Sequence, residues 1–173
     1  DFLDLFVAIT GRAPVSGAYT DEGRRPARII DVTLANASYD ESMWSVLGWV
    51  IGTQSPDSIP LVRGLETLEL GNDDLKAICA AFGTTSGAPM LHIAGHTPES
   101  ELPPHNHADV VSIDQVTLAK AWQTLNAHEA SIDLVAIGSP HASLDELHGI
   151  VDLFGHRTCR PDIHFIVCAG RDV

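Results

Sequence analysis

Apolar residues recur along the chain with two spacings, one typical of amphipathic helices and one typical of short buried strands. Segments of the two kinds follow one another and are separated by glycine, proline or polar residues. The expected helices cover residues 2–9, 39–52, 72–82, 114–126 and 144–154, and the expected strands cover residues 27–35, 59–65, 88–95, 108–113, 132–137 and 163–168. This alternation is typical of a parallel-rich sheet with helices on both faces, so it predicts a three-layer α/β/α fold.

Polar residues at the segment ends predict where several helices begin and end. Ser38 or Asp40 is the expected N-cap of the second helix, and Gly83 is the expected residue just after the third. Ser143, followed three residues later by Glu146, forms a capping box at the start of the last helix. The apolar residues expected to face a core in the last two helices are Val116, Ala119, Trp122 and Leu125, and Leu144, Leu147, Ile150, Val151 and Phe154.

The composition is that of an acidic globular protein with the length of one ordinary domain. The chain has 173 residues, 45% of them hydrophobic, and a formal net charge of −13. This charge argues against nucleic-acid binding, which needs clustered basic residues, and the only lysines are Lys76 and Lys120. No apolar run approaches the roughly 20 residues of a membrane span. The first residues lack the features of a signal peptide.

The cysteines indicate a reducing compartment. Cys79, Cys159 and Cys168 are widely spaced and form no C-x-x-C pair, which argues against a disulfide framework and favours the cytoplasm. Each is expected to be a small buried residue. The chain lacks an initiator methionine and begins and ends within apolar periodic stretches, so we expect it to be a segment of a longer polypeptide.

The sequence GSPH at residues 138–141 separates an expected strand from the capped helix that follows. Ligands of open α/β sheets bind outside the carboxyl ends of the strands. The start of the following helix favours an anion and disfavours a charged imidazole. A neutral His141 therefore suits acid–base chemistry or substrate orientation. The alternative is an ordinary loop histidine that is hydrogen-bonded to the backbone.

A second stretch, GHTPES at residues 95–100, repeats this arrangement. Thr97 can cap a helix, Pro98 suits the first helical position, and Glu99 lies in the first turn. The alternative is a well-formed turn. His92, within the preceding apolar run, is expected to be a core histidine.

Three other stretches offer polar groups of lower specificity. Arg24 and Arg25 are adjacent in a loop, where they can clamp a carboxylate or belong to a solvated turn. The sequence GTTSG at residues 83–87 is rich in hydroxyls but lacks the pattern of a phosphate loop. His105 and His107 have the H-x-H spacing of a metal pair, but no third ligand is evident.

Several stretches together resemble the large catalytic domain of the aconitase X family. They are DFLDLFVAITGRAP, DEGRRPAR, WSVLGWVIG, IPLVRGLE, LKAICAAFGTTSGAPMLHIAGHTPE and IDLVAIGSPHASLDEL, in matching order over nearly all of the chain. The resemblance implies an aconitase-like α/β fold paired with a small swivelling domain or subunit. It also implies an iron–sulfur hydro-lyase that acts on a small-molecule substrate. That substrate is cis-3-hydroxy-L-proline in bacterial members and mevalonate 5-phosphate in archaeal relatives.

The chain departs from the family at one important position. Many relatives carry a cysteine that resembles a cluster ligand where this chain has Ser139, and a serine oxygen is a poorer ligand for iron–sulfur than a thiolate. Either Ser139 has a substrate role or the ligands lie elsewhere, with Cys168 as another candidate. Further cluster ligands are expected outside this segment, and the isolated segment is expected to be inactive.

Dehydration of a hydroxy acid needs a base, groups that hold the carboxylate, and an acid or iron that takes the leaving hydroxyl. The expected reactive residues are His141 and Ser139. The expected substrate-binding residues are Arg24, Arg25, Thr84, Thr85, Ser86, Thr97, Glu99 and Ser143. The few lysines and a glycine loop without basic residues favour cis-3-hydroxy-L-proline, converted to pyrroline-2-carboxylate. The alternatives are a mevalonate 5-phosphate dehydratase large subunit, a non-catalytic fragment, and a small-molecule binding domain on the same fold.

Overall fold

The computed structural model describes residues 2–34, 39–126 and 131–171, and at Glu41, Ser139 and Pro140 it describes the backbone alone. The chain divides into two compact units, Asp1–Ala121 and Trp122–Val173.

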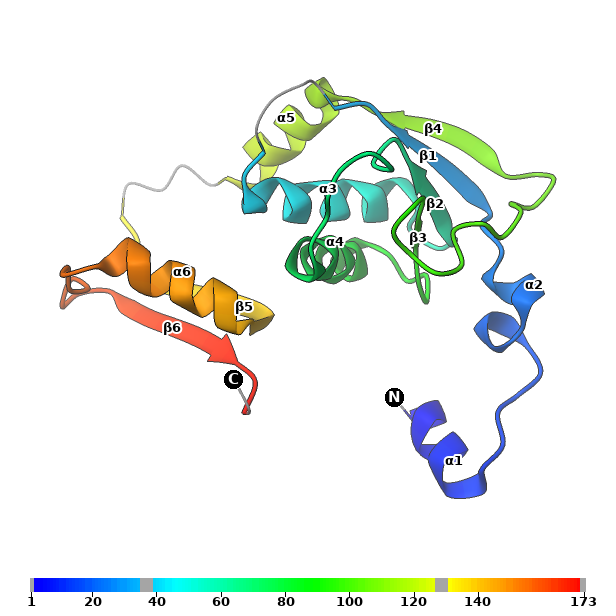
Figure 1. Cartoon of the computed structure of the whole chain (residues 1–173), viewed down its shortest axis with the longest axis horizontal. Coiled ribbons are helices and arrows are strands. Elements are labelled where there is room, and N and C mark those ends of the chain that lie inside the picture. The colour runs from blue at the N-terminus through cyan, green and yellow to red at the C-terminus, as the bar shows by residue number, and fades with distance from the viewer. Residues whose placement is uncertain (1, 35–38, 127–130, 172–173) are drawn as a thin grey trace. The chain divides into compact units, whose positions relative to one another are not determined.

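The first unit is built on a four-stranded parallel sheet with the strand order β3-β2-β1-β4 (Figure 1). Its elements are α1 (Phe2–Thr10), the 3-10 turn η1 (Gly17–Tyr19), α2 (Asp21–Arg24), β1 (Arg28–Val32), α3 (Glu41–Gln54), β2 (Pro60–Arg63), α4 (Asn72–Thr85), β3 (His92–Ile93), β4 (Asp109–Ile113) and α5 (Gln115–Leu125), which crosses the boundary between the units. The alternation of helices with parallel strands confirms the predicted α/β class.

The core of this unit lies between one face of the sheet and the helices α3 and α4. Ile30 of β1, Val62 of β2, Leu47 of α3 and Ile78 of α4 are all fully buried in one cluster. Full burial of such a side chain contributes about 1.5–3 kcal/mol. Gly48 lets α3 and α4 approach closely, because a Cβ there would collide with the carbonyl oxygen of Ile78.

The opposite face of the sheet carries an ion pair near the carboxyl ends of its strands. Asp31 and Arg63 are partners in the register of β1 and β2. Arg63 donates from Nε to Asp31 Oδ1 at 2.7 Å and from Nη2 to Oδ2 at 2.9 Å. This bidentate bond raises the pKa of the Arg63 guanidinium above its usual value. Because Ile30 and Val62 face the core, the alternation of side chains directs the pair to the other face.

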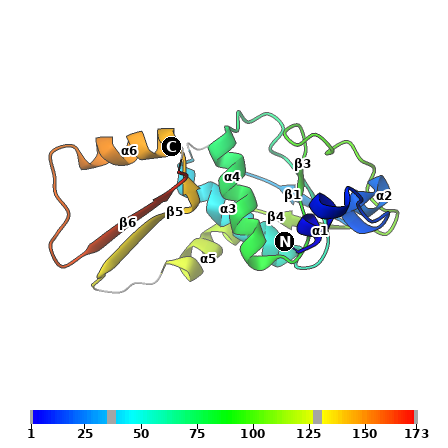
Figure 2. The same cartoon turned by 90° about the horizontal axis from the view of Figure 1, so that it is seen from below.

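The second unit is a β-α-β arrangement formed by β5 (Leu134–Ala142), α6 (Leu144–Phe154) and β6 (His164–Ala169). The two strands pair in parallel, and α6 lies alongside them (Figures 1 and 2). The rings of Phe154 and Phe165 meet edge to face with centroids 5.1 Å apart, which joins the helix to β6. Among the described residues of this unit, Ala142 alone is buried.

The structure corrects two predicted element boundaries and confirms a third. The helix α4 continues through Gly83 to Thr85, so the expected end at Gly83 is wrong. Gly83 does not have the left-handed φ of a residue that ends a helix in this way. Of the expected strand 88–95, only the two residues of β3 form a strand. Asp40 caps α3 as expected by accepting from the Ser42 amide at 3.0 Å, while Ser38 lies outside the described residues.

The predicted inward face of α5 is wrong, and that of α6 holds only for Leu147, Ile150 and Phe154, which are half-buried. In α5 the buried residues are Leu118 and Ala121, while Val116, Trp122 and Leu125 are 59%, 46% and 48% exposed. In α6 no residue is buried, and Leu144 and Val151 are 55% and 65% exposed. A helical stripe in a sequence gives the period of the apolar residues, but it does not specify which element covers them. The cysteines were also expected to be buried, and all three are exposed and free.

Candidate functional site

The stretch with His141 lies inside a strand rather than after it. The ladder of β5 and β6 pairs Ile137 with Val167 and then resumes with Ala142 opposite Ala169. Residues 138–141 therefore lie opposite Cys168 alone and form a bulge. Bulges interrupt pairing and redirect side chains, and they occur often beside active sites. The sequence predicts a strand that ends at Ile137, because the apolar run stops at Gly138.

Gly138 is required by the geometry of this bulge. Its φ of +88° is rarely adopted by residues with a side chain, and a Cβ there would collide with the carbonyl oxygen of Cys168. The close approach holds the bulge against the end of β6. His141 is exposed at the end of the bulge, and the side chain of Ser139 lies outside what the structure describes.

The helix that follows the bulge begins as predicted. The Glu146 amide donates to Ser143 Oγ at 3.1 Å, and the Ser143 amide donates to Glu146 Oε2 at 2.7 Å. This confirms the capping box. The positive end of the α6 dipole therefore lies two residues from His141, as the sequence indicated. The chemical roles of His141, Ser139 and Ser143 stay predictions.

In the first unit, Arg24 joins two distant stretches of chain. Its Nε donates to both carboxylate oxygens of Glu99, at 2.9 and 2.8 Å. Nη1 donates to the carbonyl oxygen of Ala18 at 3.0 Å, and Nη2 donates to Asp21. Three of its five N–H groups are thus engaged by the protein, and a substrate carboxylate would compete with two carboxylates already present.

Arg25 is engaged in a similar way. Its Nε donates to the carbonyl oxygen of Pro103 at 2.8 Å and its Nη2 donates to that of Pro104 at 2.9 Å. Nη1 donates to both carboxylate oxygens of Glu22, and this bond holds the pKa of Glu22 below its usual value. Arg25 therefore attaches α2 to the segment that leads into β4.

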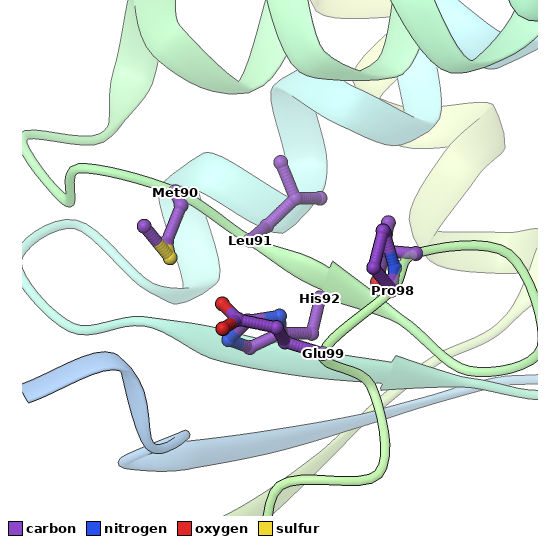
Figure 3. A pocket seen from close by; sticks show the side chains of 6 residues that line it. Met90, Leu91, His92, Pro98 and Glu99 are labelled. Carbon is purple, nitrogen blue, oxygen red and sulfur yellow. The ribbon is translucent and has the colours of Figure 1, made fainter. Parts of the chain in front are cut away.

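A pocket of about 410 Å³ lies beside β3 (Figure 3). It is lined by Met90, Leu91, His92, Thr97, Pro98 and Glu99. The pocket brings together two predicted site residues, Thr97 and Glu99, and Glu99 joins it to Arg24.

The stretch that contains Thr97 forms a turn and no helix. Thr97 Oγ1 accepts from the Ile93 amide at 2.9 Å and donates to the Ile93 carbonyl oxygen at 3.2 Å. The two short bonds close the chain onto the end of β3. The turn that was the alternative prediction is therefore the one observed.

The hydroxyl residues at the end of α4 precede β3, so they do not lie at the carboxyl end of that strand, where ligands of such sheets bind. Thr84 Oγ1 donates to the Ala81 carbonyl oxygen at 2.7 Å, and Thr85 Oγ1 donates to that of Trp49 at 3.0 Å. Ser86 Oγ donates to the carbonyl oxygen of Ser55 at 2.6 Å. These bonds hold the end of α4 close to α3, and none of the three residues lines the pocket.

The described residues do not fit a metal cluster. No group of three or more histidine, cysteine or acidic side chains within residues 2–34, 39–126 and 131–171 is arranged to hold a metal ion. His105 and His107 stack with ring centroids 5.3 Å apart. Iron–sulfur clusters are held mainly by cysteine thiolates. Cys168, next to the bulge, is one such donor, and this part of the chain supplies no full set around it.

Two features of the polar arrangement were not predicted. His92 is 3% exposed, which confirms a core histidine, yet it also lines the pocket. The Asp31–Arg63 pair was missed as well, although the alternation of side chains in two adjacent strands was a signal for it.

No helix in the described part of the chain has the length and apolarity needed to cross a lipid bilayer.

Comparison with known sequences gives consistent results. A family model described as "Aconitase X second domain" matches residues 26–123. The chain is 34% identical to a cis-3-hydroxy-L-proline dehydratase of Hypocrea jecorina over 99% of this chain and 30% of that protein. It is 35% identical to a protein of the same name from Pseudomonas aeruginosa, over 100% of this chain and 31% of that protein. It is 29% identical to the phosphomevalonate dehydratase large subunit of Methanocaldococcus jannaschii, over 95% of this chain and 42% of that protein.

Comparison with solved structures points the same way. The crystal structure of Thermococcus kodakaraensis aconitase X in its holo-form matches with a TM-score of 0.81 and 28% identity, over 97% of this chain and 42% of that chain. The chain thus spans less than half the length of each of these relatives. Since the family model covers more than half of the chain, the chain belongs to the aconitase X family.

Proposed function

We propose that the intact protein is a hydro-lyase that dehydrates cis-3-hydroxy-L-proline to pyrroline-2-carboxylate. The observation that carries this proposal is the identity of 34–35% to two dehydratases of that name along essentially the whole chain. The archaeal large subunit is 29% identical over 95% of the chain, so its reaction is the second candidate.

The reaction removes the proton from Cα and the hydroxyl from C3 of the ring, and the electron pair of the C–H bond forms a C–C double bond. The hydroxyl leaves as water once it is protonated. The resulting enamine tautomerises to the pyrroline. In this proposal a neutral His141 moves a proton, because it lies at the end of a fixed bulge and beside the start of α6. Ser139, in the same bulge, contacts the substrate or the metal centre.

The intact enzyme is proposed to contain an iron–sulfur cluster, as the resemblance to the family implies. Such a cluster would supply a Lewis acid for the leaving hydroxyl. Because the described residues do not fit a complete ligand set, most of its ligands would come from the rest of the polypeptide. Cys168 and Ser139 are the candidates from this chain.

A small swivelling domain or subunit is proposed as the partner of this chain. The name "large subunit" of the archaeal relatives supports such an arrangement. The free, exposed cysteines are compatible with a reducing cytoplasm, where we place the reaction.

The test is product identification with the intact protein. Proton NMR of a reaction with cis-3-hydroxy-L-proline should show disappearance of the signals of the Cα proton and of the C3 carbinol proton, and growth of the signals of pyrroline-2-carboxylate, in which C3 is a methylene group. A parallel reaction with mevalonate 5-phosphate serves as the comparison. Dehydration of the phosphate ester alone would assign the second function instead.

A further inference from the structure

The pocket beside β3 combines apolar walls with hydrogen-bond acceptors. Met90, Leu91 and Pro98 provide the apolar surface, and His92 and Glu99 provide polar atoms (Figure 3). Its volume of about 410 Å³ lies within the roughly 300–1,000 Å³ range of small-molecule pockets. A ligand of this pocket would be small and would have an apolar body.

His92 presents an acceptor nitrogen. Its Nε2 lies 2.8 Å from the carbonyl oxygen of Arg24, which can only accept a hydrogen bond, so Nε2 carries the proton. In the neutral ring Nδ1 then holds a lone pair. Nδ1 has no partner among the described side chains and backbone groups. No unpartnered side-chain nitrogen or oxygen in the described part of the chain is fully buried, so Nδ1 keeps some accessible surface, and His92 is one of the residues that line the pocket.

The Glu99 carboxylate can accept further hydrogen bonds. Among the residues that the structure describes, both of its oxygens accept from Arg24 Nε alone, and a carboxylate offers about four lone-pair sites. The Glu99 side chain is 39% exposed, so a ligand can reach it. The bond to Arg24 fixes the position of the carboxylate before a ligand arrives.

Most of the side-chain donor groups near the pocket already bond to the protein. The Thr97 hydroxyl proton is used by the Ile93 carbonyl oxygen, and Arg24 divides its bonds among Glu99, Asp21 and Ala18. With Asp21 and Glu99 beside a single arginine, the local charge is negative. The pocket therefore suits a hydrogen-bond donor with positive charge and disfavours an anion.

We propose that this pocket binds the protonated ring amine of a small cyclic amino acid. Glu99 accepts one ammonium proton in a charge-assisted bond, His92 Nδ1 accepts the other, and Met90, Leu91 and Pro98 contact the ring. The identification of the ligand as the hydroxyproline substrate rests on the proposed function. In that case Glu99 and His92 determine specificity, because mevalonate 5-phosphate has no amine.

The test is calorimetric binding of two probes to the intact protein. L-Proline has the ring, the carboxylate and the ammonium group, and it lacks the leaving hydroxyl. Tetrahydrofuran-2-carboxylate keeps the ring and the carboxylate but replaces the ammonium with an ether oxygen. Loss of a charge-assisted bond should weaken binding of the ether by about 10- to 100-fold. Equal affinity for the two probes, or binding of neither, would overturn the proposal.

Single substitutions test which side chains of the pocket bind the ammonium group and the ring. Glu99→Gln should remove most of the preference for L-proline over the ether. Met90→Phe should weaken the binding of both probes, because the larger side chain narrows the pocket. Asp21→Asn is the matched control, because it loosens the same arginine while Glu99 remains in place. Asp21→Asn should retain most of the preference, because Asp21 does not line the pocket and acts on it only through the local charge. An equal loss in Asp21→Asn and Glu99→Gln would mean that Glu99 acts only by holding Arg24.

The two proposals can fail separately. If cis-3-hydroxy-L-proline is not dehydrated but the preference for L-proline persists and depends on Glu99, the amine pocket stands and the proposed substrate is wrong. If dehydration occurs with unchanged kcat and KM in Glu99→Gln, the pocket proposal is wrong and the proposed function stands.

Discussion

Arg24 and Glu99 are 75 positions apart in the chain, yet Arg24 Nε donates to both oxygens of the Glu99 carboxylate, at 2.9 and 2.8 Å. The bond joins α2, just before β1, to the turn that follows β3. A part-buried, bifurcated, charge-assisted hydrogen bond of this kind holds two connections in place around the pocket.

Replacing Arg24 with Gln should lower the free energy of unfolding by about 1–3 kcal/mol, because charged hydrogen bonds are lost and Glu99 is left without its partner. Urea unfolding of the intact protein measures this. The matched control is Arg160→Gln, which breaks a pair that is 72% and 58% exposed and should change stability by less than about 1 kcal/mol. Equal effects of the two substitutions would contradict a special role for Arg24.

Gly138→Ala should destabilise the bulge of β5. An alanine would have to adopt a φ of +88°, and its Cβ would collide with the Cys168 carbonyl oxygen. A strained backbone conformation costs of order 1–3 kcal/mol. Gly149→Ala in α6 is the control, because a Cβ at Gly149 meets nothing within 4 Å. That substitution should stabilise by about 0.4–1 kcal/mol, and a loss in both variants would argue against the bulge geometry.

Ser143→Ala should remove one half of the capping box and cost about 1 kcal/mol of stability. Turnover of the folded enzyme should fall much less than stability. Urea unfolding and steady-state kinetics on the same preparation separate the two effects. An unchanged unfolding midpoint with a collapsed kcat would place Ser143 among the substrate-binding residues instead.

His141→Asn should lower kcat by about 10²–10⁴-fold, which is the usual contribution of a general acid or base. Iron content and circular dichroism should stay close to those of the unchanged enzyme. His148→Asn, in the middle of the neighbouring helix α6, is the control and should leave kcat unchanged. A kcat within about threefold of the original for His141→Asn would mean that His141 is an ordinary histidine of the bulge.

The sequence predicted the helices and strands better than it predicted their surroundings. Capping residues such as Asp40 and Ser143 act locally, so their positions followed from their neighbours in the chain. The exposed sides of Val116 and Leu144 could not be predicted, because burial depends on which elements pack against a helix. Glycine was ambiguous as well. Gly83 lies inside a helix and Gly138 inside a bulged strand, whereas the sequence predicts the end of an element at each.

The candidate site was predicted in part. Thr97 and Glu99 were identified and lie at one pocket, but the bond from Arg24 to Glu99 was not, because the sequence does not show that the two segments meet. Arg24 was expected to hold a substrate carboxylate, and in the structure it already holds two carboxylates of the protein. Pairing of charges across 75 positions is a property of the fold rather than of either local sequence.

The most direct test of the proposed function is the ratio of kcat/KM for cis-3-hydroxy-L-proline to that for mevalonate 5-phosphate, measured with the intact, iron-loaded protein. A site built for the amine should reject a substrate that leaves its hydrogen-bond acceptors unpaired in the complex, by a factor on the order of 10⁴. A ratio of that order in favour of the amino acid is the expected result. A ratio below one, with mevalonate 5-phosphate as the better substrate, would contradict the proposed function.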